Sequence, residues 1–283
     1  MKNKKKILII FEFSKLSGGG HYSRAIKLNK FLKNDYSTKI YEFNKVKNIK
    51  NLKKFNLIIL DLKKFSLKKL KNIFNNLSDK ILTIENFNNQ FGNYNLSIFD
   101  HSKKKYKNRF CGLKFSIVET VDKFPKKEKN KIFISIGHNP KRKNIIEIIK
   151  FIKENANLNF SIAMNLKNKI KTKLQNIKFC NKENYQREFM SSYIAITNAG
   201  LTLIEALYFR IPCIVLPQTL YEKKFSQYLL KKKLILAFIK KKIEFPNKLK
   251  IKIVKKKIYK IIDGKGLYRI KKLIVKILND KNI

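Results

Sequence analysis

A histidine in a glycine-rich segment is the feature of this sequence best suited to chemistry. The segment Gly18–Arg24, GGGHYSR, follows the first apolar run of the chain, Ile7–Phe11. That run predicts a buried strand, and the apolar spacing over Ala25–Leu32 predicts a helix. At such a turn the glycines let the backbone approach a ligand, the helix N-terminus favours an anion, and His21 can exchange protons near neutral pH. The alternative is a glycine-rich turn that contains a histidine by chance.

A second segment, Thr197–Ala206, has the sequence TNAGLTLIEA and combines a small-residue turn with the start of a predicted helix. Thr202 and Glu205 have the T-x-x-E spacing of a capping box, which would satisfy backbone amides without any ligand. The functional alternative is that these amides hold a diphosphate while Glu205 accepts hydrogen bonds from ribose hydroxyls. The sequence leaves both interpretations open.

A third segment, Ile211–Gln218, has the sequence IPCIVLPQ and predicts a buried strand that opens into a proline-containing loop. Gln218 and, one helical turn further on, Glu222 are candidates for contacting a sugar. The alternative is that one of them only solvates the loop.

The charge of the chain is extreme, with a formal net charge of +47 over 283 residues. Only six of the 66 basic residues are Arg, and Lys is spread along the whole sequence. Because base readout and bidentate phosphate binding rely on Arg, we ascribe the charge to the AT-rich codons that Lys shares with Ile and Asn. No nucleic-acid partner is expected. The positive electrostatic field of the chain should still attract polyanionic ligands, and we also expect weak association with anionic membrane surfaces.

The cysteines and the hydropathy pattern predict a soluble, cytoplasmic protein. Cys111, Cys180 and Cys213 are widely spaced and form no C-x-x-C, which is typical of reduced thiols. The N-terminal apolar run is too short for a secretory leader and is interrupted by Glu12, and no window approaches the length of a membrane span. No acidic or histidine cluster has metal-ligand spacing, so neither a metal nor another cofactor is expected. The sequence does not indicate an oligomeric state.

Apolar content of 44% excludes general disorder, and the order of predicted elements favours an α/β fold with parallel sheets. The predicted strands are Ile7–Phe13, Thr38–Phe43, Leu57–Leu60, Lys80–Ile84, Leu96–Phe99, Lys114–Val118, Ile132–Ile136, Asn159–Ala163, Ile194–Ile196 and Pro212–Leu216. The predicted helices are Tyr22–Leu32, Leu67–Leu77, Asn144–Lys153, Leu201–Tyr208, Glu222–Leu230, Ile251–Ile262 and Leu267–Leu278.

The polar segment Asp122–Asn130 predicts a linker between two domains, residues 1–122 and residues 123–283. Two similar α/β halves imply a cleft, and ligands of open α/β sheets bind beyond the carboxyl ends of the strands. All three histidines, His21, His101 and His138, follow predicted strands. We expect them to lie at the edges where ligands bind.

The order and spacing of these motifs resemble a known family. The pattern G-G-G-H-x-x-R after the first strand, I-S-I-G after the linker, and then T-N-A-G-L-T-L-I-E-A with I-P-C-I-V-L-P-Q is similar to the UDP-sugar hydrolases of pseudaminic acid biosynthesis and the related spore-coat polysaccharide proteins. The resemblance covers most of residues 6–232. It implies a GT-B-like arrangement of two Rossmann-like domains and a UDP-sugar substrate.

The resemblance also implies roles for residues of the N-terminal half. His21 would be the base that activates water to attack the anomeric carbon and expel UDP. Gly20 and Arg24 complete its motif, and Arg24 would support the loop or the anionic substrate. Asp61, at the end of its strand, matches an acidic residue near the sugar pocket.

In the C-terminal half, the resemblance places the nucleotide at Gly200, Thr202 and Glu205, with Glu205 on the ribose. Gly137 matches the start of a glycine-rich loop near the phosphates. His138 departs from the family pattern, which has a glycine there, and would instead donate to a phosphate. Bond cleavage through an oxocarbenium-like state, with a base opposite a leaving group stabilised by backbone amides, needs no metal.

Three functions follow from these motifs. The first is a hydrolase of a UDP-linked modified amino sugar that supplies nonulosonic acid biosynthesis. The second is a glycosyltransferase that uses the same donor in cell-surface polysaccharide synthesis. The third is a basic protein that binds nucleic acid or membrane surfaces without catalysis.

Overall fold

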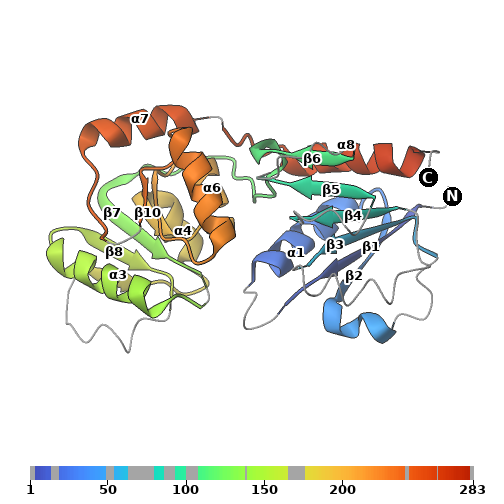
Figure 1. Cartoon of the computed structure of the whole chain (residues 1–283), viewed down its shortest axis with the longest axis horizontal. Helices are drawn as coiled ribbons and strands as arrows, with labels where there is room; N and C mark the ends of the chain where they lie inside the picture. Colours follow the sequence, from blue (N-terminus) through green and yellow to red (C-terminus); the bar gives the residue numbers. More distant parts are fainter. Residues whose placement is uncertain are drawn as a thin grey trace. The chain divides into compact units, whose positions relative to one another are not determined.

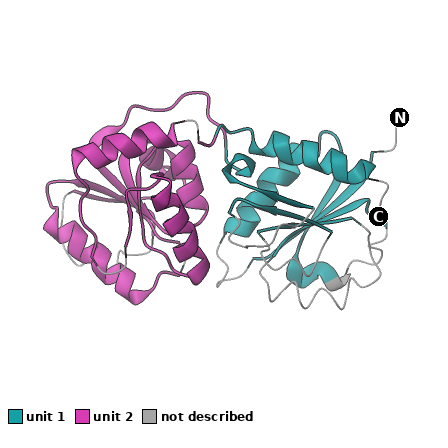
Figure 2. Cartoon of the chain, turned by 45° about the horizontal axis from the view of Figure 1, so that its top comes forward, with its two compact units in different colours: residues 1–119, 263–283 teal, residues 120–262 magenta. Residues whose placement is uncertain are grey.

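The computed structural model of the chain describes residues 4–13, 19–48, 54–62, 80–85, 93–99, 108–137, 139–164, 176–239, 242–259 and 261–280. The chain divides into two compact units, each with its own sheet (Figure 2). Unit 1 comprises Met1–Glu119 together with Asp263–Ile283, and unit 2 comprises Thr120–Ile262.

Unit 1 contains a six-stranded parallel sheet in the order β2-β1-β3-β4-β5-β6 (Figure 1). Its strands are β1 (Lys6–Phe11), β2 (Ser37–Glu42), β3 (Leu57–Asp61), β4 (Ile81–Ile84), β5 (Tyr94–Ser97) and β6 (Arg109–Cys111). The central strands β1 and β3 are nearly continuous apolar runs because both of their faces are buried.

Side chains of β1 alternate between two cores. Ile7 and Ile9 face α1 (Gly20–Leu32) and α8 (Gly266–Asn279), whereas Leu8 and Ile10 face the opposite core, which includes Val46 of the 3₁₀ helix η1 (Phe43–Asn48). This alternation is the two-residue period of a strand. Helix α1 is therefore fixed directly against the strand that precedes it.

The last helix belongs to unit 1, although the sequence analysis assigns it to the second domain. Ile270, Ile274 and Ile277 of α8 are fully buried in the core that β1 and α1 share. The apolar stripe of α8 was evident in the sequence, but the sheet that covers it was not. The units divide near residue 119, and the predicted linker Asp122–Asn130 already includes the first residues of a strand.

Unit 2 contains a second six-stranded parallel sheet, in the order β12-β11-β10-β7-β8-β9. Its strands are β7 (Glu128–Ser135), β8 (Asn159–Ile162), β9 (Ile177–Phe179), β10 (Ser192–Thr197), β11 (Cys213–Val215) and β12 (Ala237–Phe238). Its helices are α3 (Arg142–Glu154), α4 (Tyr185–Ser191), α5 (Leu201–Tyr208), α6 (Leu220–Lys231) and α7 (Lys248–Ile258).

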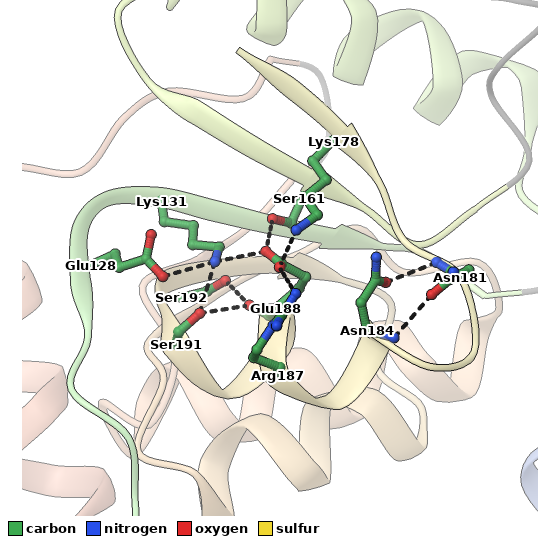
Figure 3. Close-up of polar contacts among 10 residues, drawn as sticks. All are labelled: Glu128, Lys131, Ser161, Lys178, Asn181, Asn184, Arg187, Glu188, Ser191 and Ser192. Atoms are coloured by element: carbon green, nitrogen blue, oxygen red, sulfur yellow. Dashed lines mark hydrogen bonds and ion pairs between the residues drawn. The ribbon is translucent and has the colours of Figure 1, made fainter.

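The buried carboxylate of Glu188 connects α4 to the sheet of unit 2 (Figure 3). Glu188 forms ion pairs of 2.7 Å with Lys131 and with Lys178, and Ser161 donates to it over 3.0 Å. Burial raises the pKa of Glu188, but these donors outweigh burial and hold the pKa at about 2. The carboxylate of Glu188 already has these partners within the protein, so we assign the cluster a structural role.

The predicted fold class, α/β with two parallel sheets, is confirmed. The strand predicted at Lys114–Val118 is wrong, because Leu113–Phe115 forms the short 3₁₀ helix η3 and the edge strand is β6. The predicted helix Leu67–Leu77 lies outside the described residues. Within the described ranges, no helix combines the length and the apolar character needed to cross a membrane.

Gly266, the first residue of α8, should tolerate no side chain. A Cβ atom there would lie 2.0 Å from the carbonyl oxygen of Ser116. Ala favours a helix over Gly by up to about 1 kcal/mol, but an overlap with backbone is harder to relieve and costs about 1–3 kcal/mol or more. We therefore expect Gly266→Ala to lower the free energy of unfolding in urea, whereas Lys272→Ala on the exposed face of α8 should not. Equal stability of the two variants would contradict this packing.

Candidate active site

Unit 1 brings His21, Arg24 and Asp61 into one hydrogen-bonded cluster. Nδ1 of His21 lies 2.6 Å from Oδ1 of Asp61. The guanidinium of Arg24 donates to both carboxylate oxygens, from Nε to Oδ2 over 2.8 Å and from Nη2 to Oδ1 over 2.7 Å. Arg24 thus holds the carboxylate in the two-pronged geometry typical of strong Arg–carboxylate pairs.

Asp61 is ionised because Arg24 and His21 donate hydrogen bonds to it inside the protein. Its side chain is completely buried, and burial alone would raise its pKa. The charges of Arg24 and His21 and their hydrogen bonds outweigh burial and hold the pKa of Asp61 well below its usual range. The cluster therefore contains a permanent carboxylate at neutral pH.

This carboxylate fixes the tautomer of His21. An ionised carboxylate only accepts hydrogen bonds, so Nδ1 of His21 must carry the proton between them. In the neutral imidazole, Nε2 is then left with a lone pair. A histidine held in this way by an aspartate is the arrangement of a general base. Nη2 of Arg24 also lies 3.2 Å from Nδ1, but both atoms are donors, so the carboxylate is the acceptor for each.

Topology explains why residues 40 positions apart meet. β1 and β3 are neighbours, and Phe11 is paired in register with Asp61 at their carboxyl ends. Helix α1 starts just beyond that edge, and the spacing of His21 and Arg24 places both on one face of it. The edge of a parallel sheet where the strands end is where α/β proteins bind ligands.

The start of α1 has few described neighbours. Among the described residues, a Cβ atom at Gly19 or Gly20 would meet nothing within 4 Å, and no side chain caps the helix. Tyr22 is 46% exposed and packs edge-on against Phe13, which is 51% exposed, with ring centroids 5.8 Å apart. This aromatic pair beside His21 was not predicted, although two aromatic residues that flank a glycine segment are a visible signal in the sequence.

In unit 2, three loops meet at the carboxyl ends of β7, β10 and β11. Gly137 has a φ of +85°, a conformation that favours glycine, and a Cβ atom there would lie 3.4 Å from Nδ2 of Asn198. At Gly200 the same atom would be 3.1 Å away. Both glycines thus leave room around Asn198, which the sequence analysis did not single out.

Glu222 and Gln218 tie these loops together. Oε1 of Glu222 accepts from Nδ2 of Asn198 over 3.1 Å, and Oε2 accepts from the backbone N–H of Gln218 over 2.6 Å. Oε1 of Gln218 in turn accepts from the backbone N–H of Lys141 over 3.1 Å. The two side chains shape the loops at the predicted nucleotide site by binding the protein itself, which neither interpretation of the sequence anticipated.

The capping box predicted as an alternative at Thr202 and Glu205 does not form. Helix α5 begins at Leu201 after Gly200, with no side-chain cap, so Thr202 is already its second residue. Thr202 and Ser135 instead form hydrogen bonds with Tyr185 of α4. Burial first, and then the charge of Glu205, raise the pKa of Tyr185 to about 12 against those hydrogen bonds. Glu205 therefore lies close to this half-buried phenol.

The predicted site residues that the structure describes lie in two groups, one in each unit. His21, Arg24 and Asp61, with Gly20, lie at one end of unit 1, and Gly137, Gly200, Thr202, Gln218 and Glu222 lie at the loops of unit 2. His101 and His138 lie outside the described residues. Among the residues that the structure describes, no group of three His, Cys, Asp or Glu side chains could hold a metal ion. The three cysteines are free thiols.

Solved structures share this fold over nearly the whole chain. The glycotransferase of kitacinnamycin has a TM-score of 0.70 at 8% identity and covers 98% of this chain and 100% of its own. The S. aureus MnaA–UDP co-structure has a TM-score of 0.67 at 15% identity, with 97% of each chain covered. Medicago truncatula UGT71G1 complexed with UDP-glucose has a TM-score of 0.63 at 11% identity and covers 97% of this chain and 98% of its own.

These likenesses confirm two Rossmann-like domains of the GT-B class. No family model matches the chain. No curated protein matches it either. The resemblance to the UDP-sugar hydrolases of pseudaminic acid biosynthesis therefore stays a prediction.

Asp61→Asn should destabilise the protein, because it leaves Arg24 facing a buried neutral group. Breaking one side of a buried ion pair costs about 3–5 kcal/mol, so we expect the free energy of unfolding at pH 7 to fall by that order. Since the folded pKa is depressed, the wild-type protein should lose this contribution as the pH falls below about 4. Urea unfolding of the variant between pH 7 and pH 3 should lack this acid-dependent step, and the exposed-site control Glu119→Gln should retain it.

Proposed function

We propose that the protein is an enzyme that hydrolyses a UDP-linked modified amino sugar, releasing UDP and the free sugar for nonulosonic acid biosynthesis. The observation that carries this proposal is the contact between Nδ1 of His21 and the buried, ionised Asp61. It leaves the other imidazole nitrogen as a proton acceptor at the edge of the sheet where ligands of this fold class bind.

In the proposed reaction, Nε2 of His21 takes a proton from a water molecule. The water oxygen forms a bond to the anomeric carbon while the bond from that carbon to the diphosphate oxygen breaks, and UDP leaves with the bonding electron pair. Asp61 stabilises the imidazolium that forms, because its carboxylate already faces the ring. Arg24 keeps the carboxylate oriented and ionised.

Unit 2 is assigned the nucleotide. The diphosphate is placed at the loops around Gly137 and Gly200, where backbone amides and the start of α5 favour negative charge. Glu205, one turn into α5, is assigned to the ribose hydroxyls. Glu222 and Gln218 act through the loops that they hold and are positioning residues.

Two of the similar structures support a UDP-sugar substrate, since they were solved with UDP and with UDP-glucose. The identity of the sugar, and hydrolysis rather than another reaction, rest on the order of the sequence motifs. A protein that only binds polyanions remains the third candidate, and it would release no UDP under any condition.

Transfer of the sugar to an acceptor is the second candidate. The kitacinnamycin protein, which the chain resembles, is described as a glycotransferase. In this chain Tyr22, the residue after His21, packs against Phe13, and these two exposed rings offer a surface on which the ring of an acceptor can stack. A glycosyltransferase would use the same base, with an acceptor hydroxyl in place of water.

The test is release of UDP from UDP-linked diacetamido-trideoxy sugars and from UDP-GlcNAc with no acceptor present. We expect release that persists in a chelator and falls by about 10²–10⁴-fold in His21→Ala, since that is the usual contribution of a general base. Lys30→Ala, on the exposed side of the same helix, is the matched control. Release only after an acceptor is added would favour the transferase, and no loss in His21→Ala would remove His21 from the mechanism.

Glu205→Ala should weaken nucleotide binding more than the chemical step. Loss of a hydrogen bond to a charged acceptor corresponds to about tenfold to a hundredfold in affinity. Calorimetric titration with UDP should show this loss in Glu205→Ala and none in Glu183→Ala, which removes an exposed carboxylate from the same unit. Unchanged affinity in Glu205→Ala would exclude Glu205 from the nucleotide site.

A further inference from the structure

Unit 2 contains a cluster of three cations built from three separate segments. Lys127 lies directly before β7, Arg210 follows α5, and Lys255 belongs to α7. The guanidinium of Arg210 lies over two aromatic rings, 4.5 Å from the centroid of Phe124 and 4.2 Å from that of Tyr259. Nζ of Lys255 lies 3.5 Å from the ring centroid of Tyr193.

This cluster has no counter-charge within the described part of the chain. Lys127 donates to the carbonyl oxygen of Met190, and none of the three cations forms an ion pair with a described carboxylate. Burial, together with the charges of Lys255 and Arg210, lowers the pKa of Lys127 to about 8. Burial also lowers the pKa of Lys255. Burial and the two neighbouring cations therefore disfavour the charged form of Lys127.

The backbone conformation of Arg210 adds to the free-energy cost of placing these three cations together. Arg210 has a φ of 59° and occupies the position after the end of α5 that usually takes glycine. The hydrogen bonds from Ile211 N to Ala206 O and from Arg210 N to Leu207 O identify this ending as a Schellman motif. A side chain in this conformation costs about 1 kcal/mol or more relative to glycine.

We propose that Lys127, Arg210 and Lys255 form a binding site for a phosphate group. Two aromatic rings hold the guanidinium of Arg210, and no described carboxylate pairs with it, so its N–H donors are available to an anion. A planar guanidinium held in this way suits the paired oxygens of a phosphate, and the two lysines supply the remaining positive charge.

This site is separate from the proposed nucleotide site. Lys127 precedes β7 and Tyr193 lies near the start of β10, so the cluster is at the amino ends of these strands. The loops at Gly137 and Gly200 follow the carboxyl ends of the same strands. The two ends of a parallel strand point to opposite edges of the sheet, so a single diphosphate cannot occupy both sites.

The outer face of α7 favours a phosphate carried by an anionic lipid. Leu249 and Ile253, one turn apart, are 67% and 41% exposed. Lysines lie on both sides of them along the helix: Lys250, Lys252, Lys256 and Lys257. Exposed apolar residues between lysines are typical of a helix that lies on an anionic membrane surface. A soluble phosphate would need only the three cations and not this face.

The experiment compares Arg210→Gly with Lys233→Gly. Lys233 also has a positive φ, of 58°, and ends α6 with the same pair of backbone hydrogen bonds, but it is exposed and lies outside the cluster. Each variant removes one positive charge and gives glycine a position that it prefers, so neither should unfold the protein. They differ only in whether the charge belongs to the site.

Binding is measured on the full chain at constant ionic strength, by calorimetry with inorganic phosphate and by sedimentation with vesicles of phosphatidylcholine with or without phosphatidylglycerol. We expect Arg210→Gly to weaken binding to one of these anionic probes by about tenfold or more, and Lys233→Gly to leave it within about twofold. A loss confined to the anionic vesicles assigns the phosphate to a lipid, and a loss with inorganic phosphate assigns it to a soluble ligand. Equal binding by the two variants to every probe would overturn the proposal.

At pH 8.5, binding of the probe should also be coupled to proton uptake, since an anion raises the pKa of Lys127 towards its ordinary value. Sulfate, which does not titrate in this range, is the probe for that measurement, made in buffers of different ionisation enthalpy. Uptake that persists in Lys127→Met would contradict the site. Release of UDP from a UDP-sugar should be the same in Arg210→Gly and in the wild-type protein, so failure of the proposed hydrolase and failure of this site are distinguishable.

Discussion

The arrangement of unit 1 around its candidate site depends on one buried carboxylate. Asp61 has no access to solvent, so it can remain charged only where strong donors surround it. Those donors, His21 and Arg24, lie on the first turns of α1 and therefore link the start of that helix to the end of β3. The same contact that stabilises the fold thus orients the imidazole and selects its tautomer. The contact with Asp61 therefore sets both the position of the His21 imidazole and its capacity to accept a proton.

A second carboxylate organises unit 2 in a similar way. Glu222 contacts Asn198 from the loop after β10 and the backbone of Gln218 from the loop after β11. Neither loop has regular backbone hydrogen bonding to hold it, so these contacts fix the space beside Gly137 and Gly200. In both units, a carboxylate near the ends of parallel strands accepts hydrogen bonds from the segments that follow those strands and so holds these segments in place. Parallel sheets favour this outcome because the ends of all their strands lie at one edge.

The sequence predicted the central strands and α5 well, because buried parallel strands are continuous apolar runs and α5 follows a clear small-residue turn. It failed where short elements carry little pattern: β6 and β12 have three and two residues. The unit to which α8 belongs could not be predicted, since an apolar stripe does not say which sheet covers it.

The candidate site shows the same limit. His21 and Arg24 were predicted together because they belong to one sequence motif, and three residues along a helix are neighbours. Asp61 joined them only through family resemblance, since its contact depends on the pairing of β1 with β3. The roles of Gln218 and Glu222 depend on three loops that converge in space, and no spacing within one segment encodes that.

The few arginines of the chain are informative because of the bias towards lysine. If base composition alone set the choice of cation, lysine would serve at every position where only a solvated positive charge is needed. Three of the six arginines occupy positions that use the planar guanidinium. Arg24 donates from two nitrogens to Asp61, and Arg269 does so to Asp263. Arg210 is the third: its guanidinium lies over two aromatic rings, and no described carboxylate pairs with it. Since Arg24 and Arg269 each pair with a carboxylate, we infer that the partner of Arg210 is also an anion with paired oxygens, supplied from outside the described chain.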